Sequence, residues 1–518
     1  MKLLKAMATV AGLTGISRIL GFLRDILTAA LMGAGPVADA FFVALKLPNL
    51  FRRITAEGAF SVAFVPMYSG KLEKEGETRA DEFASNAFGV MLTVLVPFTI
   101  IALIVMPWII YAIAPGFHGG EQRYDLAVEM SRITFPYLLL MSLSALLGGM
   151  LNAHDRFGPF AAAPILFNLC MIIGLVAFTP MLETPGHGLS WGVFFAGITQ
   201  LAWMAYSIRR AKIRFKLRRP KFNGDIKKLF KLMGPGVIGA GVVHINLFAD
   251  VIIASLLPEG SISYLYYADR LNQLPLGLVG IAVGTALLPM LSKAFASGNH
   301  ERAQYLFNRA LEICLLLALP AAVALFVAGE PMIKVLFERG QFTAENTDMT
   351  AQVLMGYTIG LPAYIAVKVF SSAYWSQQDT VTPVKISIIC TFMNIAIALA
   401  LIGWLGVAGI ATATGIAGWV QFVLLHRGLK KIPAAEYDPR FIRFLPRVVL
   451  STCFMAVVLY SAAHLMGPMF DGDTVPKILA LSALIGVGVV SYGFAALLSG
   501  ALKIDEIKKY LLKKGQHV

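Results

Sequence analysis

The sequence predicts an all-α polytopic membrane protein with fourteen transmembrane helices. Its 518 residues are 57% hydrophobic and only 14% charged, and their mean hydropathy is +0.72. A soluble globular protein carries about 25% charged residues. Apolar runs of about 20 residues, enough to cross a bilayer as a helix, recur from one end of the chain to the other. No polar stretch between them is long enough to form a separate soluble domain.

The fourteen expected spans follow from these apolar runs, taken in chain order. Spans eleven and twelve are separated only by Trp404–Leu405, and spans two and eight are long and contain charged residues. The N-terminal segment resembles a signal peptide, but Arg18 and Arg24 interrupt it, so we expect an uncleaved first helix. The expected spans are about 4–31, 37–68, 84–113, 128–152, 159–180, 189–208, 232–257, 263–295, 306–328, 349–375, 384–403, 406–426, 441–467 and 477–500.

The loop charges predict that both termini lie in the cytoplasm. The formal net charge is +14, and the basic residues cluster in short loops. Loop 209–231 holds eleven Lys and Arg against one acid, loop 427–447 holds six, and the tail 503–518 holds five. This is the positive-inside pattern, which sets orientation and does not indicate nucleic-acid binding. The amphipathic tail is expected to contact anionic membrane lipids. The loops expected outside, with their immediate borders, together hold about four basic residues, namely Arg123, Lys334, Arg339 and Lys477.

A weak internal repeat predicts two lobes. The string FVPMYS at Phe64–Ser69 ends span two, and LLPMLS at Leu287–Ser292 ends span eight. Lobes of six spans each then share one orientation, related by an axis along the membrane normal. The expected division is an N-lobe at 1–208, a basic cytoplasmic linker at 209–231, a C-lobe at 232–427, two further helices within 428–500, and a basic cytoplasmic tail at 501–518.

Charged residues crowd the second span. A charge at the bilayer centre costs about 2.5–3.5 kcal/mol, and such residues usually face a water-filled cavity. Pro48 is expected to bend the helix, and Arg52 lies at the edge of a polar stripe. A face of this kind indicates a hydrophilic and mostly anionic neighbour. Helical spacing aligns the stripe itself, which is made of Asp39, Lys46, Asn49, Arg53 and Glu57.

The first span adds Arg18, Arg24 and Asp25, so cations exceed acids by two over spans one and two. Arg18 and Asp25 are seven residues apart on one helix face and could neutralise each other. Arg53 and Glu57, four apart, could form a second pair. One interpretation is a set of ion pairs that fix helix packing. We favour the other, a cationic cavity, because pairing leaves the excess cations unexplained.

Two further groups lie in the second half of the chain. In span eight, the adjacent Asp269 and Arg270 project in different directions, and Arg270 is expected to face the interface between the lobes. Asp250, Asn394 and Thr414 lie inside apolar spans, where their oxygens could bind Na⁺. Alternatively, Asp250 is protonated or paired with a basic residue.

Motifs for catalysis are missing from the sequence. It has no GxxxxGK[ST] phosphate loop and no HExxH motif. Gly188–Gly192 matches GxSxG but has no strand before it, so we attribute the match to chance. The four cysteines are far apart inside apolar segments and do not indicate a metal site. We therefore expect neither an enzyme nor a metalloprotein.

Three strings carry a resemblance to a known family: GFLRD at Gly21–Asp25, ADAFFVALKLPNLFRRITAEGAF at Ala38–Phe60, and YYADRL at Tyr266–Leu271. Through them the chain closely resembles the MurJ (MviN) family of lipid II flippases, within the multidrug/oligosaccharidyl-lipid/polysaccharide exporter superfamily. The resemblance covers essentially the whole chain. Leu45 and Thr55 stand where the family commonly has Phe.

The resemblance implies two lobes in a V that alternate access, with no cofactor. The implied substrate is lipid II, an undecaprenyl-pyrophosphate carrying a disaccharide–pentapeptide, moved across a bacterial plasma membrane. The last two helices would hold its lipid tail, and other cell-wall synthesis proteins are candidate partners. The implied cavity arginines are Arg24, Arg52 and Arg270, with Arg18, Asp25, Asp39, Lys46 and Glu57 also in required or cavity-lining places.

The resemblance also implies coupling to the membrane potential or to Na⁺. Asp250, Asn394 and Thr414 match the sodium site known in some members of the family. Ala398 stands where a second carboxylate can occur, which weakens the match.

Two other functions compete with the hypothesis of a lipid II flippase. A drug or polysaccharide exporter of the same superfamily would fit the fold, although fewer cavity arginines would then be expected. A polytopic glycosyltransferase acting on lipid II would need catalytic acids in a sizeable outer loop. The acids expected outside are instead scattered over loops of about 20 residues or fewer.

Overall fold

Helices make up all the regular secondary structure of the described residues. The computed structural model describes residues 2–52, 60–117, 122–217, 219–429, 432 and 435–502. Within them the chain divides into two compact units. Unit 1 contains residues 1–263 and 339–342, and unit 2 contains residues 264–338 and 343–518.

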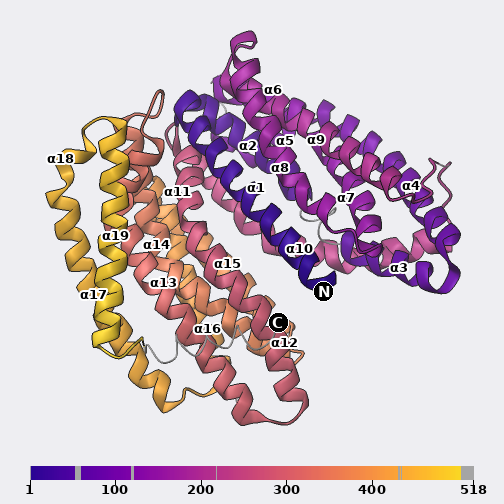
Figure 1. Ribbon diagram of the computed structural model, residues 1–518. Coiled ribbons are helices and arrows are strands. Elements are labelled where there is room, and N and C mark those ends of the chain that lie inside the picture. Colours follow the sequence, from indigo (N-terminus) through magenta and orange to yellow (C-terminus); the bar gives the residue numbers. More distant parts are fainter. Residues whose placement is uncertain are drawn as a thin grey trace. The chain divides into compact units, whose positions relative to one another are not determined.

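Unit 1 contains the helices of the first half of the chain (Figure 1). Within it α8 packs on α1 and α9, and α2 packs on α6 and α9. The helices are α1 (Lys2–Met32), α2 (Pro36–Phe51), α3 (Ser61–Glu75), α4 (Glu77–Ile104), α5 (Met106–Ile113), α6 (Gln122–Thr134), α7 (Tyr137–Ala153), α8 (Gly158–Ile173), α9 (Pro185–Arg210) and α10 (Gly224–Ser255).

Unit 2 contains most of α11 and all of the later helices. Its centre is α14, which packs on α12, α13 and α16, and α17 and α19 pack on α13. The helices are α11 (Ser261–Pro275), α12 (Ile281–Ala296), α13 (His300–Phe337), α14 (Ala344–Ser376), α15 (Val381–Leu405), α16 (Val407–Leu429), α17 (Pro439–Leu465), α18 (Gly467–Phe470) and α19 (Thr474–Leu498).

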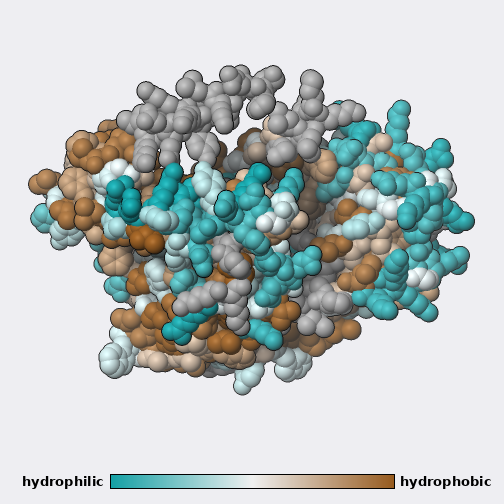
Figure 2. Space-filling view, turned by 90° about the horizontal axis from the view of Figure 1, so that it is seen from below, coloured by the Kyte–Doolittle hydropathy of each residue, from teal (hydrophilic) through white to brown (hydrophobic). Residues whose placement is uncertain are grey.

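The all-α membrane class is confirmed. Each of the fourteen expected spans coincides with one helix or with a run of two or three consecutive helical segments. Nine helical segments of the described chain are long and apolar enough to cross a membrane by length and composition alone. Large apolar side chains lie on the surface, including Trp404 at 90% and Leu465 at 81% exposure. Figure 2 shows one face of the molecule, on which hydrophobic residues in brown lie beside hydrophilic residues in teal.

Proline and glycine explain local features of these helices. Pro48 cannot donate a backbone hydrogen bond, which leaves the carbonyl of Ala44 without its usual partner inside α2. The hydroxyl of Thr134 on α6 donates to that carbonyl at 3.0 Å. In unit 2, a Cβ on Gly360 would lie 2.5 Å from the Cα of Gly415, so the two glycines let α14 and α16 approach closely.

Two expectations about the organisation need comment. The break expected at Trp404–Leu405 lies one residue later, at Gly406, whose φ of +54° ends α15. Packing groups α10 with unit 1, whereas the repeat assigns it to the C-lobe. The repeat-based division of the chain stays a prediction, because compactness and internal repetition are different properties.

Candidate functional site

Arg24 on α1 forms a buried polar cluster inside unit 1. Its Nε and Nη2 donate to Asp25 Oδ1 at 3.1 and 2.7 Å. Its Nη1 donates to Asn168 Oδ1 on α8 at 2.9 Å and lies 3.5 Å from Met171 Sδ. Asn168 in turn donates to the carbonyl of Ser17 at 3.0 Å. Asp25 therefore compensates the charge of Arg24, and Asn168 fixes the direction of the guanidinium group.

The pairing in α1 differs from the one that spacing suggested. Asp25 pairs with its neighbour Arg24, while the side chain of Arg18 is exposed. Gly21 brings α8 within reach of this cluster, because a Cβ there would lie only 3.4 Å from Asn168 Nδ2. Sequence reasoning missed Asn168. Its signal was a lone amide inside the apolar run of span five.

Asp39 is fully buried near the start of α2. Its Oδ2 accepts from the backbone N–H of Gly260 at 2.7 Å, and its Oδ1 accepts from the N–H and hydroxyl of Ser263 at 2.9 and 2.6 Å. Gly260 and Ser263 lie at the first turn of α11. The carboxylate therefore satisfies backbone donors that a helix N-terminus leaves open, and it is compatible with the dipole there.

The rest of the polar stripe of span two is described in part. Lys46 and Asn49 on α2 are half-buried, and Asn49 Nδ2 donates to the carbonyl of Leu45 at 2.9 Å. Arg52 follows α2 and is also half-buried. Arg53 and Glu57 lie outside the described residues.

Unit 2 carries Asp269 and Arg270 on α11, both half-buried. The Arg270 guanidinium carbon lies 4.5 Å from the ring centroid of Tyr266, a cation–π distance. Asp269 Oδ2 accepts from Gln273 Nε2 at 2.5 Å. Asp269 and Arg270 thus contact Gln273 and Tyr266, and the expected direction of Arg270 toward the interface between the lobes stays a prediction.

Two members of the expected ion site are neighbours within unit 2. Thr414 Oγ1 on α16 lies 3.5 Å from Asn394 Oδ1 on α15, and Ala398 one turn further on is buried. Asp250 lies on α10 in unit 1 and is half-buried. Oxygen atoms of this kind suit a hard cation, so the sodium site stays a prediction with Asn394 and Thr414 as its adjacent pair.

The fold and these buried charges define the class of this protein: a polytopic α-helical membrane protein with ionisable groups on membrane helices, as in transporters. A sequence profile described as "Lipid II flippase MurJ" matches residues 28–481. The chain belongs to the MurJ family. This confirms the resemblance carried by the three sequence strings.

Curated relatives match nearly the whole chain. A protein of Rhizobium meliloti named probable lipid II flippase MurJ is 40% identical over 516 residues, covering 98% of this chain and 96% of the relative. The lipid II flippase MurJ of Burkholderia cenocepacia is 34% identical over 470 residues, covering 89% of this chain and 90% of the relative.

Solved structures agree with the family. A lipid II flippase MurJ in an inward closed conformation matches with a TM-score of 0.78 and 28% identity, covering 94% of this chain and 98% of that structure. An inward-facing multidrug transporter of the MATE family matches with a TM-score of 0.68 and 16% identity, covering 82% of this chain and 99% of that structure. The second likeness shows a shared fold only.

Proposed function

We propose that this protein is a lipid II flippase of a bacterial plasma membrane. It would carry the undecaprenyl-pyrophosphate-linked disaccharide–pentapeptide from the inner to the outer leaflet by alternating access, without making or breaking a covalent bond. The observation that carries the proposal is the match along nearly the whole chain to relatives named lipid II flippases. The exporter and glycosyltransferase alternatives have no comparable support, since the drug transporter shares only the fold.

In this proposal Arg24, Arg52 and Arg270 bind the substrate pyrophosphate. The guanidinium of Arg24 already presents Nε and Nη2 to one carboxylate oxygen of Asp25. Phosphate oxygens accept from the same fork of N–H groups, so substrate would replace one anionic acceptor by another. Asp25 would then act as the counter-ion that holds Arg24 when no substrate is bound. Arg270, stacked on Tyr266, would be held in one plane for the same purpose.

The test is complementation of a strain depleted of its own flippase, beside lipid II binding by purified variants. Arg24→Lys, Arg52→Lys and Arg270→Lys should each impair growth and binding although the charge is kept, because an ammonium group cannot form the bidentate fork. The matching Ala variants should abolish growth while membrane abundance stays normal. Normal growth of an Arg24→Ala/Arg270→Ala double variant would contradict the clamp and favour a packing role.

The flippase function is tested separately from the clamp. Acute depletion of the protein should reduce the lipid II that an impermeant probe reaches on the outer surface. Unchanged exposure after depletion, with the protein verified as lost, would contradict the function whatever the arginines do.

We further propose that transport is coupled to Na⁺ or to the membrane potential through Asp250, Asn394 and Thr414. The adjacency of Asn394 and Thr414 supports the sodium version. Each elementary charge that crosses with the field contributes about 2.3 kcal/mol per 100 mV, enough to bias a return step. Asp250→Asn should weaken transport and remove its sodium dependence. Transport by the unmodified protein that is equally fast without sodium would contradict an ion site.

A further inference from the structure

Three metal-ligating side chains converge at one end of unit 1, far along the chain from the charged cluster of α1. Glu129 lies on α6, Glu183 lies in the segment before α9, and His187 lies in the first turn of α9. One ligand atom of each lies within 4.8 Å of the other two. Neither the polar stripe nor the proposed substrate clamp uses these residues.

The imidazole of His187 is held in place by its own helix start. Thr184 is the N-cap of α9, and its Oγ1 accepts from the backbone N–H of His187 at 3.4 Å and lies 2.9 Å from Nδ1 of the ring. The His187 side chain is only 10% exposed. A ring held through Nδ1 presents Nε2 to the Glu129 carboxylate, and metal-binding histidines are commonly held through their second nitrogen in this way.

The spacing of the donor atoms suits one small cation. His187 Nε2 lies 3.3 Å from Glu129 Oε2. Two ligands of a tetrahedral ion with bonds of about 2.0–2.1 Å are about 3.3–3.4 Å apart. Glu183 is exposed and the Glu129 side chain is 57% exposed, so both carboxylates can turn toward the ion without disturbing the core. A cation would also relieve the repulsion between two adjacent carboxylates.

The donor set selects the class of metal. Ca²⁺ and Mg²⁺ are bound by oxygen ligands, whereas an imidazole nitrogen with two carboxylate oxygens suits Zn²⁺ and its divalent transition-metal neighbours. We propose that Glu129, Glu183 and His187 bind one zinc-class divalent ion, with water in the fourth position. The ion would join α6 to the start of α9 and so stabilise this end of unit 1.

The experiment uses the full-length protein in detergent with its affinity tag removed. Chelator-treated protein is titrated with Zn²⁺ and, separately, with Co²⁺, whose visible absorption reports tetrahedral coordination. We expect one ion per chain, and binding at least tenfold weaker in His187→Ala and in Glu129→Gln/Glu183→Gln. The Gln pair keeps a hydrogen-bond partner for His187 but removes the anionic ligands. His464→Ala, on an exposed histidine of α17, is the matched control and should bind as the unmodified protein does.

A thermal readout separates a real site from loose surface binding. Zn²⁺ should raise the unfolding midpoint of the unmodified protein and of His464→Ala, since an ion that binds only the folded state stabilises it. Zn²⁺ should leave the unfolding midpoint of Glu183→Gln nearly unchanged. This substitution is on the surface, so the variant is expected to fold normally. Equal zinc binding by the unmodified protein and all the site variants, or no binding at micromolar zinc, would overturn the proposal and leave an ordinary histidine–carboxylate contact.

Discussion

Asp39 acts at the scale of a single residue, because one buried carboxylate ties the start of α2 to the first turn of α11. Its two oxygens accept from two backbone N–H groups and one hydroxyl. A stripe of polar residues along a helix says only that its members share a face, so sequence spacing could not distinguish this burial from exposure to a cavity. The α11 end that Asp39 satisfies is 221 to 224 residues away in the chain.

We predict that Asp39→Ala destabilises the protein more than Asp39→Asn. Alanine leaves buried donors without an acceptor, at about 1–3 kcal/mol for each such group, whereas asparagine keeps one acceptor oxygen. The measurement is the apparent thermal unfolding midpoint of the full chain in detergent. Asp125→Asn, an exposed acid on α6, is the control and should change the midpoint little. An Asp39→Ala midpoint equal to that of the control would show that these hydrogen bonds contribute nothing.

Arg24 illustrates a second limit of sequence reasoning at this scale. Adjacent residues on a helix project about 100° apart, so spacing suggested Arg18, and not Arg24, as the partner of Asp25. The long arginine side chain instead turns back onto the carboxylate beside it, and Asn168 of α8 holds the other end of the fork. Residue types and spacing identified Arg24 as a site residue, but its partners depend on tertiary packing.

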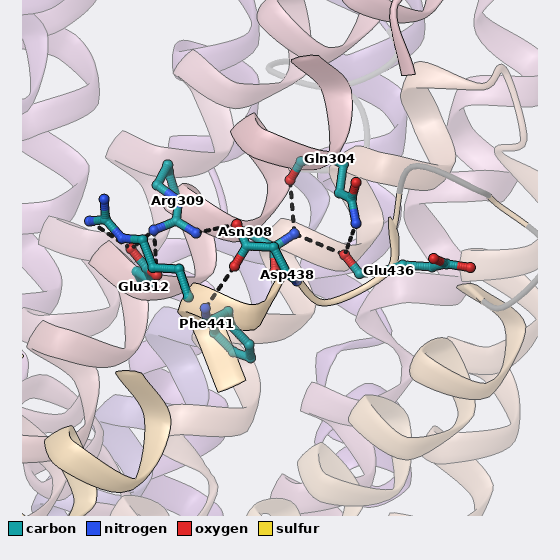
Figure 3. A network of polar contacts seen from close by, with 8 residues as sticks. Gln304, Asn308, Arg309, Glu312, Glu436, Asp438 and Phe441 are labelled. Carbon is teal, nitrogen blue, oxygen red and sulfur yellow. Dashed lines mark hydrogen bonds and ion pairs between the residues drawn. The ribbon is translucent and has the colours of Figure 1, made fainter. Parts of the chain in front are cut away.

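At the scale of elements, α17 is joined to α13 by an ionic network centred on the buried carboxylate of Glu312 (Figure 3). Glu312 accepts from Arg309 at 2.5 Å and pairs with Arg440 at 3.3 Å, and its side chain is 6% exposed. Arg309 also pairs with Asp438, the N-cap of α17. One carboxylate thus compensates two arginines from different helices.

The opposite end of α13 has an exposed counterpart. Lys334 Nζ donates to Asp471, which follows α18, at 2.5 Å, and the Asp471 side chain is 71% exposed. The Lys334 ammonium holds the pKa of the Asp471 carboxyl below its usual value through this hydrogen bond. Water and salt screen such a pair far more than they screen the network of Glu312.

We predict that the two ends of α13 differ sharply in their contribution to stability. Glu312→Ala removes a carboxylate partner of Arg309, whose side chain is 12% exposed and which keeps Asp438, and should cost about 1–3 kcal/mol, while Lys334→Ala should have little effect. Apparent unfolding midpoints in detergent provide the comparison, and Glu312→Gln separates loss of charge from loss of packing. If Glu312→Ala and Lys334→Ala lowered the midpoint equally, the network of Glu312 would not be what attaches α17.

At the scale of the whole molecule, hydropathy predicted the helices well because bilayer thickness fixes the length of an apolar span. Each expected span contains a helix, yet the breaks within spans were not foreseen: α4 ends at Ile104 and α5 starts at Met106, with Val105 between them. A break of this kind depends on local backbone bonding and changes the mean hydropathy very little. For the site, the charged residues of the first two spans predicted a cationic cavity, which stays a prediction, and the family supplied the roles.

The orientation of the fourteen spans is the last prediction, and loop charge alone carries it. The basic loop 209–231 should be cytoplasmic, whereas the acidic positions Glu183 and Asp471 should be outside. Single cysteines at positions 183, 216, 430 and 471 would be placed in a chain without its four native cysteines and labelled in intact cells with a membrane-impermeant maleimide. Cysteines replacing Glu183 and Asp471 should react, while those replacing Lys216 and Lys430 should react only after permeabilisation. Labelling of position 216 in intact cells would contradict the fourteen-span topology, since one missed or additional helix would reverse every later loop.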